Sequence, residues 1–410
     1  MLKKSIYDRC NISTNKSDDR FVGIQFNNGD VSIRFPLGFN LEHDTEEELR
    51  KDILLLIQTI RNTITHRESE IGNNSGEFKN TMFPVTAYLN VLKDYFVRGY
   101  YKETEVHYKK GSHGKINWAK TIKTQCSRIQ EEEAYYLDFV VRKNKANNNQ
   151  MITLIHRYCV YESFQKIGWL FTSFIPPKPT IRYNLNVFRS VLKDKLYSTF
   201  NDRNKQLFAS MLAIIEFQGD KDAPVAYMYG TNRFEYVWEK LIDRVYGIQN
   251  KRDFFPKTEW NIIGDGKYDS SSLEPDSIMF CNGNVYILDA KYYQYGRTLS
   301  PSDLPASASV NKQITYGEYV AKIREDNQKQ YKIYNAFLIP FDALNDNWNK
   351  FANPLVVNIG EAVSQWKRSE NEYEKIQGIL IDTKHLMSIT VRQDQTEIIK
   401  LADAIVGRTE

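Results

Sequence analysis

Three residues between positions 276 and 291 have side chains suited to metal-assisted hydrolysis. Asp276 stands at the start of one apolar run, and Asp289 and Lys291 stand at the end of the next. Because side chains alternate along a strand, Asp289 and Lys291 are expected on the same face of the second run. Two carboxylates and an amine at the edge of a sheet can hold a divalent cation and activate water beside it.

The two apolar runs are predicted to pair as a β-hairpin. Asn282-Gly283 separates them, and this dipeptide between apolar runs is the strongest short-range signal for a hairpin turn. Pairing brings the start of the first strand next to the end of the second. We therefore expect Asp276 to lie close to Asp289 and Lys291.

The acids of this hairpin are predicted metal ligands. Asp276 and Asp289 would each provide a carboxylate, and the backbone carbonyl of Ala290 would provide a third oxygen. Ligands that are all oxygens suit a hard cation, so we expect Mg²⁺, for which Mn²⁺ can substitute. Lys291 would position the attacking water and stabilise charge on a phosphate. The alternative is a hairpin that carries surface acids and a surface lysine.

A predicted helix over residues 233–246 offers a further acid. Glu235 and Glu239 lie four residues apart and therefore share one helix face. Asn232 and Glu235 have the spacing of a capping box, which gives Glu235 a structural explanation. Glu239 is thus the better candidate for the active site, with an exposed helix face as the alternative.

The elements predicted between residues 233 and 340 follow the order helix, strand, Asp276 strand, Asp289 strand, helix and strand. The helix between the last two strands allows them to be parallel, since parallel neighbours need a crossover. Elsewhere, residues 21–35 predict a hairpin, residues 151–155 a strand and residues 264–272 a loop.

Pro275-Asp276 followed by Asp289-Ala290-Lys291, in this order of elements, resembles the PD-(D/E)xK nucleases. The resemblance implies an α/β fold, α+β overall. A C-terminal nuclease core with a mixed central sheet flanked by helices would accompany an N-terminal α+β domain. The resemblance also implies hydrolysis of phosphodiester bonds in double-stranded DNA.

The helix that follows the motif adds to this resemblance. Gln313 and Tyr316 resemble a motif of the RecB-like nucleases, with a spacing one residue shorter than usual. Gln313 would orient a ligand or a water molecule, and Lys312 would touch a backbone phosphate. A purely structural role remains the alternative for Gln313.

Within this superfamily the chain resembles the McrC-like subunits and, among them, the LlaJI family of restriction endonucleases. The resemblance rests on four stretches: Gly114–Ile122, Phe234–Glu239, the motif hairpin and Asn311–Gln313. It implies a partner, an McrB-like AAA+ motor that hydrolyses GTP, and a DNA methyltransferase in the same system. This chain has no Walker A motif, so nucleotide hydrolysis would need the other subunit.

One of these stretches is basic and follows a glycine-flanked turn. Lys115, Asn117, Trp118 and Lys120 are candidates for a contact with the partner or with DNA. A tryptophan in such a place can equally anchor a core, and the sequence does not distinguish the two interpretations.

Length and proline content predict the domain organisation. A chain of 410 residues is long enough for two or three domains. The proline-rich stretch at 176–179 is the clearest break. We therefore predict an N-terminal partner- or DNA-interaction domain over 1–175, a helical connector over 176–222 and a nuclease domain over 223–410.

Composition excludes several other classes of protein. The net charge of +4 permits a nucleic-acid partner without requiring one, and the four cysteines are too scattered for a zinc site or a disulfide scaffold. None of the six histidines lies near the motif, which disfavours a histidine-metal mechanism. The chain shows neither a signal core nor a membrane-spanning run, so we expect a cytoplasmic protein with no membrane partner.

Two other functions fit the same sequence. One is a stand-alone nuclease of DNA repair or recombination, which would not depend on a nucleotide-driven motor. The other is a non-catalytic DNA-binding or assembly subunit that keeps the nuclease fold. The intact set of Asp276, Asp289 and Lys291 favours a catalytic role.

Overall fold

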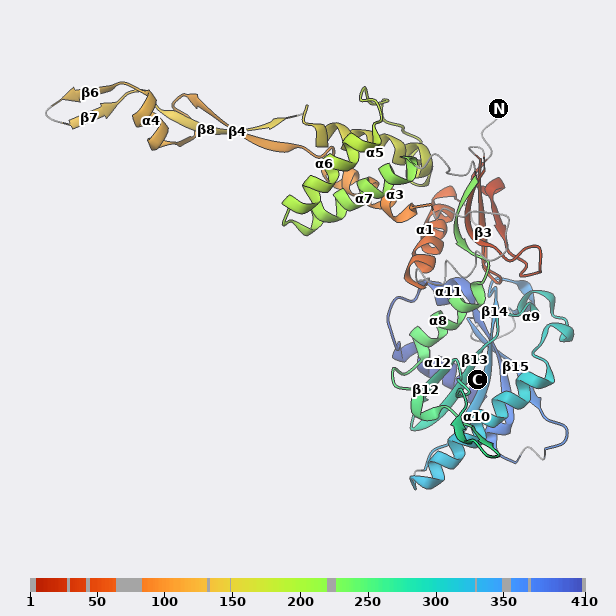
Figure 1. Ribbon diagram of the computed structural model, residues 1–410. Coiled ribbons are helices and arrows are strands. Elements are labelled where there is room, and N and C mark those ends of the chain that lie inside the picture. The colour runs from red at the N-terminus through yellow and green to blue at the C-terminus, as the bar shows by residue number, and fades with distance from the viewer. Residues whose placement is uncertain are drawn as a thin grey trace. The chain divides into compact units, whose positions relative to one another are not determined.

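The computed structural model divides into two compact units (Figure 1). One unit comprises Met1–Met82 and Pro224–Glu410, and the other comprises Phe83–Ala223. The structure describes residues 5–27, 30–41, 45–63, 83–130, 133–147, 149–219, 226–328, 330–348, 355–367 and 370–407. None of the helices in these ranges is both long and apolar enough to span a membrane.

A five-stranded mixed sheet forms the centre of the first unit. Its strands run in the order β12 (Ser277–Cys281), β13 (Asn284–Ala290), β14 (Ile333–Phe341), β16 (Lys375–Asp382) and β15 (Val356–Val363). The inner pairs β13/β14 and β14/β16 are parallel, and the outer strands β12 and β15 are antiparallel to their neighbours. All nine residues of β14 are buried, as expected for a central strand flanked on both faces.

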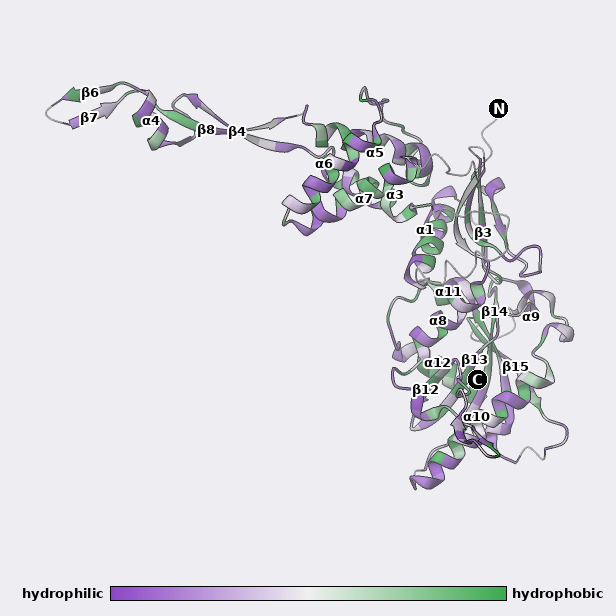
Figure 2. Cartoon of the chain, in the orientation of Figure 1, coloured by the Kyte–Doolittle hydropathy of each residue, from purple (hydrophilic) through white to green (hydrophobic). Residues whose placement is uncertain are grey.

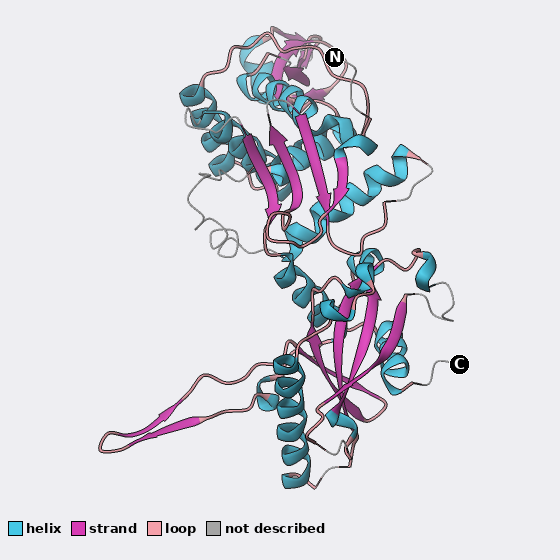
Figure 3. Ribbon diagram, turned by 90° about the vertical axis from the view of Figure 1, so that its right-hand side faces the viewer, coloured by secondary structure: helices cyan, strands magenta, loops and turns pink. Residues whose placement is uncertain are grey.

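Helices cover both faces of this sheet, which confirms the predicted fold class (Figure 3). Val285 and Ile287 of β13 pack against Tyr316 and Val320 of α10 (Ser307–Asp326). On the opposite face, Asn358 of β15 donates a hydrogen bond to α12 (Gln395–Val406). The other helices described in this unit are α1 (Glu46–Thr63), α8 (Phe234–Tyr246), α9 (Tyr295–Thr298) and α11 (Thr383–Ser388). Figure 2 shows hydrophobic residues concentrated along β13 and β14.

A second sheet in the same unit has the order β1 (Cys10–Ile12), β3 (Asp30–Phe35), β2 (Val22–Asn27) and β9 (Ala226–Thr231). The predicted hairpin at residues 21–35 is confirmed as β2 and β3. A separate hairpin consists of β10 (Glu259–Ile262) and β11 (Gly266–Asp269), so the loop predicted over 264–272 contains a strand.

The second unit is helical and carries an extended β-arm (Figure 1). Its helices are α3 (Val85–Arg98), α5 (Met151–Ile167), α6 (Leu185–Ser198) and α7 (Asp202–Gly219). The arm is built from β4 (Glu103–Lys110), β5 (Lys115–Ile116), α4 (Trp118–Thr124), β6 (Ser127–Gln130), β7 (Glu133–Tyr136) and β8 (Val140–Asn147). The strand predicted at residues 151–155 is wrong, because these residues form the first turns of α5.

The two units divide the chain differently from the predicted boundaries at 175 and 222. The N-terminal strand β2 pairs along its whole length with β9, which brings residues 22–27 into the same unit as the motif hairpin. Helices α6 and α7 belong to the helical unit with α3 and α5, so they are not a separate connector. Short 3-10 helices complete the described elements: η1 (Tyr7–Arg9), η2 (Gly168–Leu170), η3 (Arg252–Phe254), η4 (Pro301–Asp303), η5 (Asp346–Trp348) and η6 (Glu372–Glu374).

Candidate active site

The predicted hairpin forms and brings the two aspartates together. Asn282 and Gly283 both have positive φ angles, 49° and 74°, as a tight two-residue turn requires. Ser277 then pairs with Leu288, which places Asp276 beside the end of β13. The backbone N–H of Ala290 donates a 2.7 Å hydrogen bond to Oδ2 of Asp276. The strand that carries Asp289 thus holds the other aspartate directly.

Lys291 lies at the end of β13, at the same corner of the sheet as Asp276 and Asp289. Its backbone N–H donates to the carbonyl of Leu338 at 2.9 Å, which extends the ladder between β13 and β14 by one residue. Its Nζ lies 2.5 Å from Oδ2 of Asp289. Asp289 is buried and Lys291 is only partly exposed, so the ion pair is shielded from bulk water. The structure therefore brings the three predicted residues into one cluster.

Helix α8 contributes the third acid of the cluster. Trp238 Nε1 donates a 3.1 Å hydrogen bond to the carbonyl of Leu338, the same atom that accepts from the Lys291 N–H. This anchor fixes the next residue, Glu239, at the active-site corner. Burial raises the pKa of Glu239, and the charge of Asp289 raises it further.

Glu235, four residues earlier, has a different environment. The capping box predicted from Asn232 and Glu235 is wrong: the residue before α8 is Arg233, and no side chain caps the helix. Glu235 instead accepts a hydrogen bond from Arg233 Nε at 3.3 Å. Glu239 is therefore the acid whose pKa is influenced by the charges of Asp289 and Lys291. Glu235 instead forms an ion pair with Arg233 at the start of α8.

Gln313 holds the backbone of the motif strand. Its side chain is buried on α10, and its Nε2 donates to the carbonyl of Ile287 at 2.9 Å and to Oδ1 of Asn335 at 3.3 Å. Asn335 returns a hydrogen bond to the carbonyl of Gln313 at 3.0 Å. These contacts fix β13 two residues before Asp289, so Gln313 acts as a positioning residue. The neighbouring Lys312 lies on the exposed side of α10.

Two residues that sequence patterns did not assign to the site hold the other strand. The buried Tyr316 donates its hydroxyl to the carbonyl of Glu274 at 3.0 Å, two residues before Asp276. Lys251 donates to the carbonyl of Asp276 and forms a 3.0 Å ion pair with Asp243 of α8. The sequence does not identify Tyr316 as a site residue, because its spacing from Gln313 is one residue shorter than in the known motif. It does not identify Lys251 either, because that residue lies in an ordinary polar loop.

The charges of this cluster fit a divalent cation. The pKa of Asp276 is raised to about 7, first by burial and then by the negative charges of Asp289 and Glu239. The described residues contain no group of three or more His, Cys, Asp or Glu side chains arranged to hold a metal. Mg²⁺ needs fewer, because one or two carboxylates, water and substrate phosphates complete its shell. Asp276 and Asp289 provide such a pair, with Ala290 beside them.

The basic stretch of the sequence lies on the arm of the other unit. Asn117 caps α4 by accepting a 3.0 Å hydrogen bond from the Lys120 N–H. Trp118 is 53% exposed, which excludes a role as a core anchor, and its ring contacts Phe139 only at an edge. Lys115 and Lys120 are exposed as well. These side chains are therefore available to a partner.

The raised pKa of Asp276 makes a prediction for the metal-free protein. Between the ordinary aspartate pKa of 3.8 and about 7, the folded state keeps a proton that the unfolded chain releases. The stability should therefore fall as the pH rises through this window. Asp276→Asn should raise the unfolding temperature at pH values above this window, and the gain should vanish near the lower end. Thermal unfolding at several pH values in the presence of a chelator measures this gain, with Asp265→Asn at an exposed position as the control. A gain in unfolding temperature that does not depend on pH would contradict the prediction.

The sequence matches the LlaJI restriction endonuclease family model over residues 21–359. Component YdjA of the type II restriction enzyme BsuMI, from Bacillus subtilis (strain 168), is 25% identical over 260 residues. That alignment covers 59% of this chain and 55% of YdjA, so the chain spans about half the length of this relative.

A solved structure, the half-complex of a tetradecameric assembly of Thermococcus gammatolerans McrB AAA+ hexamers with bound McrC, covers 94% of this chain and 83% of its own chain. Its sequence identity is 15% and its TM-score is 0.38, which is too low to establish a common fold. The family match, in contrast, extends over most of the sequence. The chain belongs to the LlaJI restriction endonuclease family.

Proposed function

We propose that this chain is the nuclease subunit of a restriction system and that it hydrolyses phosphodiester bonds in double-stranded DNA with Mg²⁺. The observation that carries the proposal is the cluster of Asp276, Asp289 and Lys291 at the end of the central strands. Membership of a family of restriction endonucleases supports it. The cluster and its order of elements support the proposal that the chain is a PD-(D/E)xK nuclease.

Each side chain of the cluster has a different role in the proposed reaction. Asp276 and Asp289, with the carbonyl of Ala290, would hold Mg²⁺, which supplies a Lewis acid for the phosphate and lowers the pKa of water. Lys291, now paired with Asp289, orients the attacking water and donates to the phosphate oxygen that gains charge. Glu239, whose pKa is raised by burial, accepts a hydrogen bond from that water.

Positioning comes from residues behind the cluster. Gln313 and Asn335 fix the backbone before Asp289, and Tyr316 fixes the backbone before Asp276. Such supporting contacts matter because metal ligands bind only within a narrow range of distances. Lys312, exposed on α10, would contact a DNA phosphate.

We also propose that the arm of the helical unit binds an McrB-like AAA+ GTPase. The arm carries exposed aromatic and basic side chains at its α4 segment, including Trp118 and Lys120, with Lys120 Nζ 3.6 Å from the centre of the Tyr108 ring. Exposed aromatic and cationic groups are frequent anchors of protein interfaces. A DNA methyltransferase encoded with the same system would protect the host DNA.

Removal of the cluster should abolish cleavage without unfolding the chain. Asp289→Ala and Lys291→Gln should each lower the rate of plasmid cleavage in Mg²⁺ by about 100-fold or more, because each removes charge stabilisation of the transition state. Lys267→Gln, on the exposed β10–β11 hairpin, is the control for Lys291→Gln. Normal cleavage by Asp289→Ala would show that the site is assigned wrongly.

Changes on the arm should affect only the step that depends on the partner. Trp118→Ala should weaken binding of the AAA+ subunit by about tenfold, as for the loss of a central interface aromatic. Trp260→Ala, at an exposed tryptophan on β10, is the matched control. Plasmid cleavage with and without the AAA+ subunit and GTP measures how far each variant impairs the partner-dependent step. If cleavage by the chain needs neither, the stand-alone nuclease replaces this proposal.

A further inference from the structure

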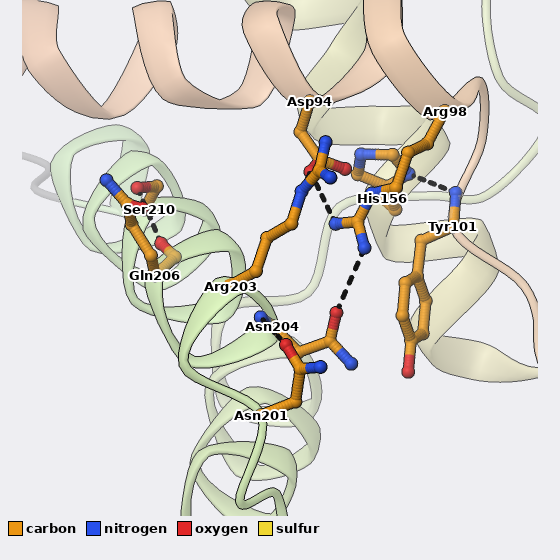
Figure 4. Close-up of polar contacts among 9 residues, drawn as sticks. All are labelled: Asp94, Arg98, Tyr101, His156, Asn201, Arg203, Asn204, Gln206 and Ser210. Carbon is orange, nitrogen blue, oxygen red and sulfur yellow. Dashed lines mark hydrogen bonds and ion pairs between the residues drawn. The ribbon is translucent and has the colours of Figure 1, made fainter.

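A buried carboxylate in the helical unit orients two arginines toward the surface. Asp94 of α3 is 7% exposed, and its Oδ1 accepts from both Arg98, one turn further along, and Arg203 of α7. Figure 4 shows the two guanidinium groups converging on this one side chain. Two cations therefore share a single negative charge.

The two arginines differ in what their remaining nitrogens contact. Arg98 uses Nη2 for Asp94 and Nη1 for Oδ1 of Asn204, at 3.3 Å, so its terminal nitrogens are both occupied. Arg203 contacts Asp94 only through Nε, at 3.2 Å. Its side chain is half exposed, and within the described residues its two terminal nitrogens form no hydrogen bond. This edge of the guanidinium is a preorganised fork for an anion.

The free edge of Arg203 belongs to a surface hollow of about 370 Å³. Lys93, Asp94, Asn90, Gln206 and Leu207 line the rest of it. Within the described residues, no carboxylate lies within ion-pair distance of Lys93. Among the described residues, the hollow thus combines an ammonium group without an ion-pair partner, an open guanidinium edge and amide groups, and the carboxylate that lines it is already shared by two arginines.

The buried groups behind the hollow do not cancel its positive charge. His156 is buried beside Asp94, and its Nδ1 accepts a 2.8 Å hydrogen bond from the Tyr101 N–H. Burial lowers the pKa of His156 to about 4, although Asp94 favours the protonated form, so the ring is neutral at physiological pH. The positive charge of the hollow therefore comes from Lys93 and Arg203 alone.

A second hollow, of about 730 Å³, adjoins the first through Arg98. It is lined by Arg98, Lys102, Asn204 and Glu103 among others. Glu103 is neutralised by Lys195, at 2.7 Å. Because Arg98 and Arg203 share one oxygen of Asp94, the two hollows are neighbours.

We propose that Lys93 and Arg203 bind a phosphate of the DNA backbone, that Lys102 in the adjoining hollow receives the next one, and that Asp94 orients Arg203. The choice of DNA as the source of the phosphate rests on the proposed nuclease function. The contact would position the duplex without reading its sequence, since phosphates are common to every base pair.

The test measures duplex binding by fluorescence anisotropy at several salt concentrations, with the full chain and a chelator that prevents cleavage. Arg203→Gln and Lys93→Gln should each weaken binding by about three- to tenfold and lower the slope of log K against log salt by about 0.9, the value for one lost phosphate contact. Arg189→Gln is the matched control, because Arg189 lies in the same unit and is held by Glu216 at 3.1 Å. It should leave both quantities unchanged.

Other outcomes would overturn the inference. If Arg203→Gln and Lys93→Gln bind DNA with unchanged affinity and salt slope, these residues do not contact phosphate, and a drop in unfolding temperature alone would indicate a purely structural network. Loss of binding to inorganic phosphate or GTP, with DNA binding intact, would assign the hollow to a small ligand instead. Because the assay needs no cleavage, a chain that binds DNA through these residues but never cuts it would refute only the nuclease function.

Discussion

The ladder between β13 and β14 fixes the groups on which the proposed chemistry depends. At its end, the carbonyl of Leu338 accepts from the Lys291 N–H and from the Trp238 indole. One backbone oxygen thereby sets the position of the lysine and of the helix that carries Glu239. Asp289 precedes Lys291 by two residues and pairs with Phe337, so the same ladder fixes its backbone. A site held by regular strands and one helix is more rigid than a site on loops.

That rigidity keeps acidic side chains near one another. The negative charges of Asp289 and Glu239 both act on the partly buried Asp276, and Lys291 forms an ion pair with Asp289. Burial and these charges raise the pKa of Asp276 to about 7. A bound divalent cation would lower that pKa again, which supports the proposed metal site.

Local patterns predicted the site better than they predicted the domains. The hairpin of β12 and β13 follows from Asn282-Gly283 and the adjoining apolar runs, and α8 follows from its apolar stripe. The pairing of β2 with β9 joins segments about two hundred residues apart, and no local sequence pattern predicts it. Met151–Ile155 has the β-branched residues of a strand, yet packing of α5 against α3 and α7 overrides that preference. The supporting contacts of Tyr316 and Asn335 likewise depend on the folded chain.

The most direct test of the metal site is a titration of Mn²⁺ into the full chain by calorimetry, because it examines the ligand set without requiring DNA or a partner. We expect saturable binding to the wild type. We also expect a loss of affinity of more than about tenfold in Asp276→Ala, since even residues that only support metal ligands have effects of that size. The control variant Asp253→Ala, outside the cluster, should bind as the wild type does. An absence of saturable binding in the wild type, or equal affinity in Asp276→Ala, would contradict the assignment of this corner as a metal-dependent active site.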